Sequence, residues 1–323
     1  MSQAAPTRRA GRAGTFLHIF PPQGTFSPHT LYAALGRSEC LAEAFARIAQ
    51  RTDPVLSART GVRMARFLAN AEPPSVEELQ QADALEVVSA LASLAAHEAL
   101  SRRVGKPTAL LGVSAGDFAA MTAAGVFGLE DATGMLLEAA AVQRRCPGRM
   151  MSLVCSPGQA ETIIAMSGAH GAKVALVYND RSVVITAPTD DLELLRKTAE
   201  TSGVHAALLP VPFGSHHAGL NRQADELSDV VGAYRRRKAT LPVYSAAGAR
   251  VYEDGESIPR AMAQNLTLPV DFPRTLRRCL RTGANVVLDL DTGGSLAASA
   301  RIVSASFAGV AVHDPFTDER FAW

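Results

Sequence analysis

The segment LLGVSAGDFAA, residues 110–120, constrains the fold most, because it joins an apolar run to a helical pattern through one serine. The run TALLGV at 108–113 has the length and flanks of a fully buried strand, and the helical pattern resumes after Ser114. Gly112, Ser114 and Gly116 fit the pattern G-x-S-x-G, whose glycines let the backbone turn sharply and raise the serine above a sheet. We therefore expect a nucleophile elbow, although an ordinary strand-to-helix turn that contains a serine is the alternative.

A serine hydroxyl needs a base, and histidine is the side chain whose ordinary pKa lies near neutrality. His216 and His217 follow the strand-like segment 205–212 in a glycine-containing turn. A side chain at such a junction can point into a cleft, so we expect the base here. The other histidines lie in tails, turns or helical faces and are interpreted as structural or solvated: His18, His29, His97, His170, His205 and His313.

Strand-like and helical segments alternate along the chain and predict an α/β fold with a hydrolase-like large subdomain and a central, mostly parallel sheet. We expect the large subdomain at 15–148 and 213–323. Its first strand is expected at 15–20, and amphipathic patterns recur at 30–52, 59–70 and 76–105.

Residues 149–212 read as strand, helix, strand, strand, helix, strand, which is the order of the ferredoxin-like motif. We expect this segment to form a small subdomain inserted into the large one.

Composition narrows the function classes. The 323 residues are 47% hydrophobic and carry a net charge of +1, which predicts a globular enzyme without a nucleic-acid partner. No apolar run approaches the ~20 residues of a membrane span, and four scattered cysteines suggest reduced thiols and no metal site. We expect a cytoplasmic protein with no membrane association and a disordered tail at 1–14.

Several motifs occur in a recognisable order: FPPQG at 20–24, the serine motif, the inserted segment, FGSH at 213–216 and NLTLPVDF at 265–272. Together they resemble the malonyl-CoA:acyl-carrier-protein transacylase family, which includes the acyltransferase domains of polyketide synthases. The resemblance covers nearly all of the chain. It implies ping-pong acyl transfer from an acyl thioester, on coenzyme A or an acyl-carrier protein, to a phosphopantetheine thiol, with no permanently bound cofactor.

The resemblance also assigns roles to matching residues. Ser114 would be the acylated nucleophile and His216 its general base, with the backbone amides of Gln23 and Ala115 as the oxyanion hole. Asn265 would orient the histidine through a carbonyl, as glutamine or asparagine does in the family. No third carboxylate would then be needed.

The chain departs from the family around the acyl group. Malonyl-selective members carry an arginine that pairs with the substrate carboxylate, and the register from Ser114 puts Ala139 there. Val113 replaces a common histidine, and Phe213 and Ser215 belong to an unusual FGSH motif. We expect these four positions to line the acyl pocket. Burying an unpaired carboxylate is costly, so the acyl group should lack one: an acetyl or other starter unit, or an aminoacyl or peptidyl chain.

Alternatives remain. A slipped register would give the arginine's role to Arg144 or Arg145. The protein could hydrolyse acyl-carrier-protein thioesters with the same Ser114 and His216, or it could be an inactive module that docks a carrier protein. A general lipase or esterase is less consistent, because it would need a triad carboxylate. An acidic carrier protein could meet arginines near 144–149 or near 277–281.

Overall fold

The structure, a computed structural model, describes residues 14–69 and 72–323, so nearly all of the expected tail lies outside it. The helices are α1 Pro28–Arg37, α2 Glu39–Thr60, α3 Val76–Gln81, α4 Leu85–Val104, α5 Gly116–Ala123, α6 Leu129–Gln143, α7 Pro157–Ser167, α8 Leu192–Thr201, α9 Asn221–Gly232, α10 Ile258–Ala263, α11 Phe272–Arg281 and α12 Ser295–Ser304. Short 3-10 turns are η1 Met64–Leu68, η2 Thr189–Asp191, η3 Ala218–Leu220 and η4 Gln264–Leu266. The strands are β1 Phe16–Phe20, β2 Ala109–Gly112, β3 Arg149–Leu153, β4 Lys173–Asn179, β5 Ser182–Ala187, β6 Ala206–Leu208, β7 Val243–Ser245, β8 Arg250–Val251, β9 Val270–Asp271, β10 Val286–Asp289 and β11 Ala311–His313.

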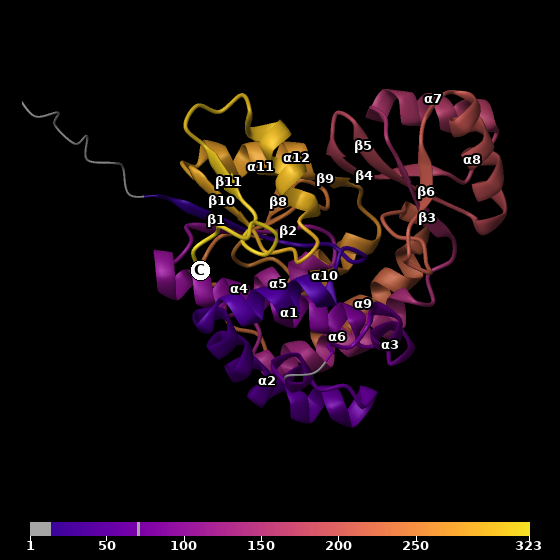
Figure 1. Cartoon of the computed structure of the whole chain (residues 1–323). Helices are drawn as coiled ribbons and strands as arrows, with labels where there is room; N and C mark the ends of the chain where they lie inside the picture. Colours follow the sequence, from indigo (N-terminus) through magenta and orange to yellow (C-terminus); the bar gives the residue numbers. More distant parts are fainter. Residues whose placement is uncertain (1–13, 70–71) are drawn as a thin grey trace, which may run out of the picture.

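The larger sheet has the strand order β11-β10-β1-β2-β7-β8. Every neighbouring pair is parallel except β7 and β8, which confirms the expected α/β class with a mostly parallel central sheet. Helices α4 and α5 pack on one face, and α11 and α12 pack on the other (Figure 1). In open α/β sheets, ligands bind beyond the carboxyl ends of the strands, which is where β2 leads into α5.

The smaller sheet has the order β6-β3-β5-β4-β9, and β3 to β6 with α7 and α8 form the ferredoxin-like arrangement. This unit stands beside the large sheet, at the upper right of Figure 1. Its fifth strand, β9, comes from the large part of the chain and pairs parallel with β4. The subdomain limits at 149 and 212 therefore stay a prediction, because the two parts share a sheet.

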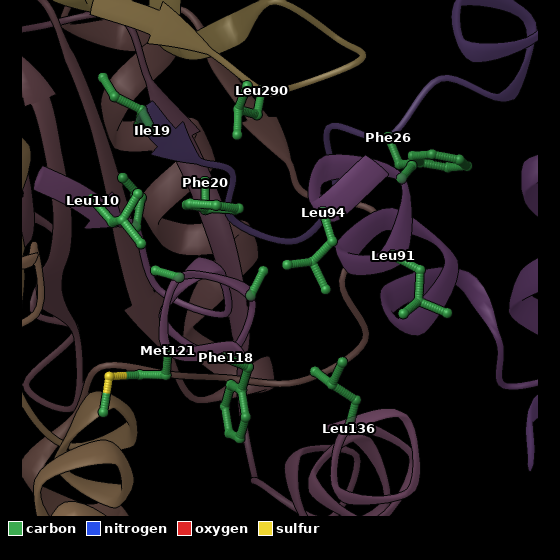
Figure 2. Close-up of a cluster of buried hydrophobic side chains, with 14 of the residues drawn as sticks. Ile19, Phe20, Phe26, Leu91, Leu94, Leu110, Phe118, Met121, Leu136 and Leu290 are labelled. Atoms are coloured by element: carbon green, nitrogen blue, oxygen red, sulfur yellow. The ribbon is translucent and has the colours of Figure 1, made fainter. Parts of the chain in front are cut away.

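The main core lies between the large sheet and the helices below it. Phe20 from β1, Leu94 from α4 and Phe118 from α5 are buried there, and Figure 2 displays them with Leu136 of α6 close by. Strand β1 is apolar except for the buried His18, because a parallel strand covered on both faces meets little water. This packing fixes the helices that surround the elbow.

Three helical patterns are interrupted in the structure. The pattern at 30–52 divides into α1 and α2 at Ser38, whose backbone is extended. The expected helix at 76–105 divides into α3 and α4, because Asp83 between them has a φ of 56°, which a continuing right-handed helix does not allow. The pattern at 59–70 covers the end of α2 and the short turn η1 instead of a further helix. Among the helices the structure describes, none combines the length and the apolar character needed to cross a bilayer.

Candidate active site

Ser114 sits at the turn between β2 and α5, with a φ of 55° in the left-handed region. Glycine is required on both sides of Ser114, because neighbouring backbone atoms lie too close to leave room for a Cβ. A Cβ on Gly112 would lie 2.6 Å from the Asp117 backbone, and one on Gly116 would lie 2.8 Å from the Pro21 carbonyl oxygen. The turn is therefore tight enough that only glycine fits on either side of the serine.

The side chain of Ser114 meets that of His216. Its Oγ lies 2.8 Å from Nε2 of the imidazole, and Nδ1 of the same ring lies 3.0 Å from the carbonyl oxygen of Leu268. Burial lowers the pKa of His216 to about 4, although the backbone carbonyls of Leu268 and Asn265 oppose that shift. The ring is thus neutral at ordinary pH, with Nδ1–H donating to Leu268 and Nε2 free to take the serine proton.

Asn265 has a further role that the sequence did not predict. Its backbone carbonyl acts on His216 as expected of an orienting group, but the 3.0 Å contact with the ring belongs to Leu268. The side-chain amide of Asn265 instead donates to the Ser114 carbonyl oxygen, at 2.9 Å, and to Oδ2 of Asp117, at 2.8 Å. Asn265 therefore braces the elbow while its main chain faces the base.

Asp117 is the centre of this bracing network. It is fully buried three residues after Ser114, and its Oδ2 also accepts hydrogen bonds from Ser245 at 2.6 Å and Tyr252 at 2.8 Å. Burial raises the pKa of Asp117 to about 6, although the hydrogen bonds that its carboxylate accepts act to lower it. A carboxylate in the first turn of an otherwise apolar helix was the available sequence signal for this residue.

The expected oxyanion donors lie at the same place. Helix α5 begins at Gly116, so the amide of Ala115 precedes the first intrahelical hydrogen bonds. Gln23 follows β1, and its side-chain Nε2 donates to Oε1 of Gln143 on α6 at 2.7 Å. Both Gln23 and Ala115 border one narrow pocket between α4, α5 and α6. Gln143, which the sequence did not point to, fixes the side chain of Gln23.

In comparison with known proteins, residues 19–303 match the acyl transferase domain family. The chain belongs to that family. Erythronolide synthase of Saccharopolyspora erythraea is 27% identical over 309 residues, which are 94% of this chain and 9% of that protein. The polyketide biosynthesis protein ThaF of Burkholderia thailandensis is 26% identical over 65% of this chain and 18% of its own length. The chain thus spans only a small part of these two relatives.

Solved structures agree on the fold. An acyl-carrier-protein S-malonyltransferase from Burkholderia pseudomallei has a TM-score of 0.79 at 20% identity, covering 94% of this chain and 96% of that one. A type II polyketide synthase malonyl-transacylase, solved with its acyl-carrier protein, has a TM-score of 0.78 at 19% identity, covering 93% and 95%. The acyltransferase therefore has the fold expected from its sequence motifs.

The residues expected at the acyl pocket of the acyltransferase fall into different environments. Ala139 borders the pocket that also holds Gln23 and Ala115. The side chain of Val113 is buried in the hydrophobic core and does not border this pocket, so its contact with the acyl group stays a prediction. Phe213 and Ser215 are buried near His216, and their contact with substrate stays a prediction.

The alternative cations do not replace the missing arginine. Arg144 pairs with Asp83 at 3.0 Å, and Arg145 pairs with Glu226 at 2.7 Å, both away from the pocket lining. His217 accepts a hydrogen bond from the Gly219 amide, at 2.9 Å, and so shapes the turn η3. Within 14–69 and 72–323, no group of three potential metal-ligating side chains is found.

Proposed function

We propose that this chain transfers an acyl group from one thioester to another thiol through an ester on Ser114. The observation that carries the proposal is the 2.8 Å contact between Ser114 Oγ and His216 Nε2, at an elbow whose two glycines cannot be replaced without a clash. Family membership supports acyl transfer as the reaction class. The remaining steps follow from the geometry around these two side chains.

In the first step, Oγ of Ser114 attacks the thioester carbonyl while its proton moves to Nε2 of His216. The oxyanion that forms lies beside the amides of Gln23 and Ala115, donors whose removal typically costs ~3 kcal/mol of transition-state stabilisation. The carbon–sulfur bond then breaks, and the departing thiolate takes the proton from His216. The products are a thiol and an acyl ester on Ser114.

In the second step, His216 takes the proton of an incoming thiol, whose sulfur attacks the ester carbonyl. The same oxyanion site receives the developing charge. The bond between Ser114 Oγ and the acyl carbon then breaks, and Oγ regains a proton from His216. The acyl group leaves as a new thioester, and the enzyme returns to its starting state.

We assign the thiol to the phosphopantetheine arm of an acyl-carrier protein, the partner present in the solved structure of one similar transacylase. The acyl donor is the thioester of coenzyme A or of another carrier protein. Helix α11 offers a surface for an acidic carrier, because four of its arginines are exposed: Arg274, Arg277, Arg278 and Arg281. Changing Arg277 and Arg281 to glutamate should raise the KM for a carrier protein, whereas Arg103→Glu on α4 should leave it unchanged.

The substrate in this proposal has no free carboxylate near the thioester. Ala139 occupies the position where the family resemblance expects the carboxylate-binding arginine, and Arg144 and Arg145 are engaged elsewhere. A buried carboxylate without a partner costs several kcal/mol. Malonyl is therefore disfavoured relative to an acyl group of the same size without negative charge.

The test is a two-stage transfer followed by intact-protein mass spectrometry. The protein is incubated with acyl-pantetheine thioesters, excess thioester is removed, and a holo carrier protein is added. Transfer predicts that the acyl mass leaves the enzyme and reaches the carrier. Release of the free acid, with no acyl carrier formed, would replace this proposal with thioester hydrolysis. Absence of any acyl-enzyme would overturn both.

A further inference from the structure

The pocket beside the oxyanion residues extends away from Ala115 between α4 and α6. Its α4 side is formed by Glu86, Ser89, Ala90 and Ser93, which lie three or four residues apart and so share one face of the helix. Apolar walls come from Phe26, Phe118 and Leu136, all three labelled in Figure 2. The pocket is thus a narrow space that borders the residues of the proposed oxyanion hole.

Glu86 is the one charged side chain that lines this pocket in the part of the chain that the structure describes. The opposite wall on α6 presents Ala139 and Ala140, which carry no charge and leave space. The mouth is neutral, because Gln23 and Gln143 satisfy each other's side chains there. An acyl group that enters meets one carboxyl group and no basic side chain on the lining.

The carboxylate of Glu86 is poorly compensated. Burial raises the pKa of Glu86, while its own backbone amide and Arg144 act in the opposite direction. Arg144 is itself bound to Asp83 at 3.0 Å, so its charge is shared with a second carboxylate. Within 14–69 and 72–323, Glu86 has no ion pair of its own. A half-buried carboxylate in this environment gains from a cationic ligand.

We propose that Glu86 selects an acyl group that carries a protonated amine, and that the α4–α6 pocket receives this amine. The proposal deepens the acyl transfer proposed above and rests on it. Where the family resemblance expects an arginine, the pocket has Ala139, and it also has Glu86. The charge that the pocket offers to a substrate is therefore opposite in sign. The recognised substrate class is thus an amino acid or a peptide joined through its carboxyl group as a thioester, with its amine free.

Ser89 and Ser93 fit the same ligand. The Ser93 hydroxyl donates to the Ala90 carbonyl at 2.7 Å, so its oxygen can still accept a hydrogen bond, and Ser93 borders the pocket. An ammonium has three donors and no acceptor, so one carboxylate and one or two hydroxyl oxygens complete its hydrogen bonding. A carboxylate in the same place would meet Glu86 and be repelled.

The experiment compares matched acyl-pantetheine thioesters on the full chain. Glycyl, β-alanyl and 6-aminohexanoyl thioesters are each paired with the neutral acyl group in which a methyl replaces the ammonium, namely propionyl, butyryl and heptanoyl. Malonyl serves as the anionic counterpart of β-alanyl. The rate of ester formation on Ser114 is followed by mass spectrometry in the wild type, in Glu86→Gln and in the control Glu77→Gln, which changes an exposed carboxylate on α3.

We expect at least one amino thioester to acylate the wild type faster than its neutral partner, and malonyl to acylate it most slowly. Glu86→Gln should reduce the ratio of the amino rate to the neutral rate by about tenfold to a hundredfold, as expected for a hydrogen bond to a charged group. Glu77→Gln should change neither. Equal effects of Glu86→Gln on amino and neutral groups, or a wild type with no amino preference, would overturn the inference while leaving acyl transfer intact. Failure of every thioester to acylate the wild type would instead overturn the proposed function.

Discussion

Ser114 and His216 face each other across 2.8 Å, and both hold a left-handed backbone, with φ values of 55° and 58°. Non-glycine residues pay a conformational cost in this region, and such residues concentrate where a fold must aim a side chain. Each half of the pair is thus held in a strained position by the packing around it. The strain on Ser114 leads to a prediction about stability.

Ser114→Gly should be more stable than Ser114→Ala by about 1 kcal/mol, because glycine adopts a positive φ without a Cβ penalty. Both variants lose the nucleophile, so the difference reports the backbone alone. Urea unfolding of the two variants under identical conditions measures it. An alanine variant as stable as the glycine variant would contradict the strained elbow.

The pH dependence of acylation should follow the lowered pKa of His216. The neutral ring is the competent form, and a pKa of about 4 keeps it neutral far below its ordinary value of 6.5. The acylation rate with an uncharged acyl thioester should therefore stay level as the pH falls through 6.5 and decline only near 4. An acid limb centred at 6.5 would show that the base is exposed to solvent.

The stability of the fold at low pH limits the range over which the acylation rate can be measured. The unfolded chain binds a proton on this histidine below 6.5, whereas the folded chain does not do so until about 4. The free energy of unfolding should therefore decrease as the pH falls across this window. Circular dichroism at each pH identifies the range in which the fold persists, and rates are compared only there.

Asn265→Ala should slow acylation and lower stability, because it removes the hydrogen bonds to the Ser114 carbonyl and to Asp117. Losing these two hydrogen bonds should cost about 1–3 kcal/mol of unfolding free energy, because each buried hydrogen bond typically contributes about 0.5–1.5 kcal/mol. If the role is positioning, kcat falls while KM for the thioester changes little. The control is Gln264→Ala, an exposed neighbour whose side chain contacts only Arg250 among the described residues. Equal acylation rates and equal unfolding free energies in the two variants would contradict the bracing role of Asn265.

Ala139→Arg should increase acylation by malonyl thioester about tenfold, because a guanidinium at this position can pair with the free carboxylate. Adding Glu86→Gln should increase it further, since the new arginine would otherwise pair with Glu86. Ala141→Arg places the same charge on α6 at a position that does not line the pocket. Malonyl rates are measured by mass spectrometry, and an unchanged rate in A139R would show that this position does not contact the acyl group.

Local constraints explain what the sequence could predict. The elbow is predictable from Gly112, Ser114 and Gly116, because a tight strand-to-helix turn needs those residue types within five positions. The order of strands and helices along the inserted segment was likewise predictable from its apolar runs. These features depend on neighbours in the chain, so composition and spacing carry them.

The rest depends on contacts between distant segments. Gln143 meets Gln23 across 120 positions, and Ser245 meets Asp117 across 128, which no local pattern encodes. Glu86 was hidden in an apparently continuous helix, and its position became clear only with the break at Asp83. Two-residue strands such as β8 and β9 are too short to leave a periodic signal. The elbow and base were therefore predictable, whereas the bracing network and the charge of the pocket were not.

The acyl-enzyme itself tests the central claim most directly. After incubation with a reactive acyl thioester and acid quenching, proteolysis and peptide mass spectrometry locate the acyl group. The account predicts a single site at Ser114, lost in Ser114→Ala and strongly reduced in His216→Ala. Cys146 and Cys279 are poor competitors, since burial raises the pKa of Cys146 to about 11 and that of Cys279 to about 12. An acyl group found on a cysteine or a lysine, or one that persists in Ser114→Ala, would contradict the account.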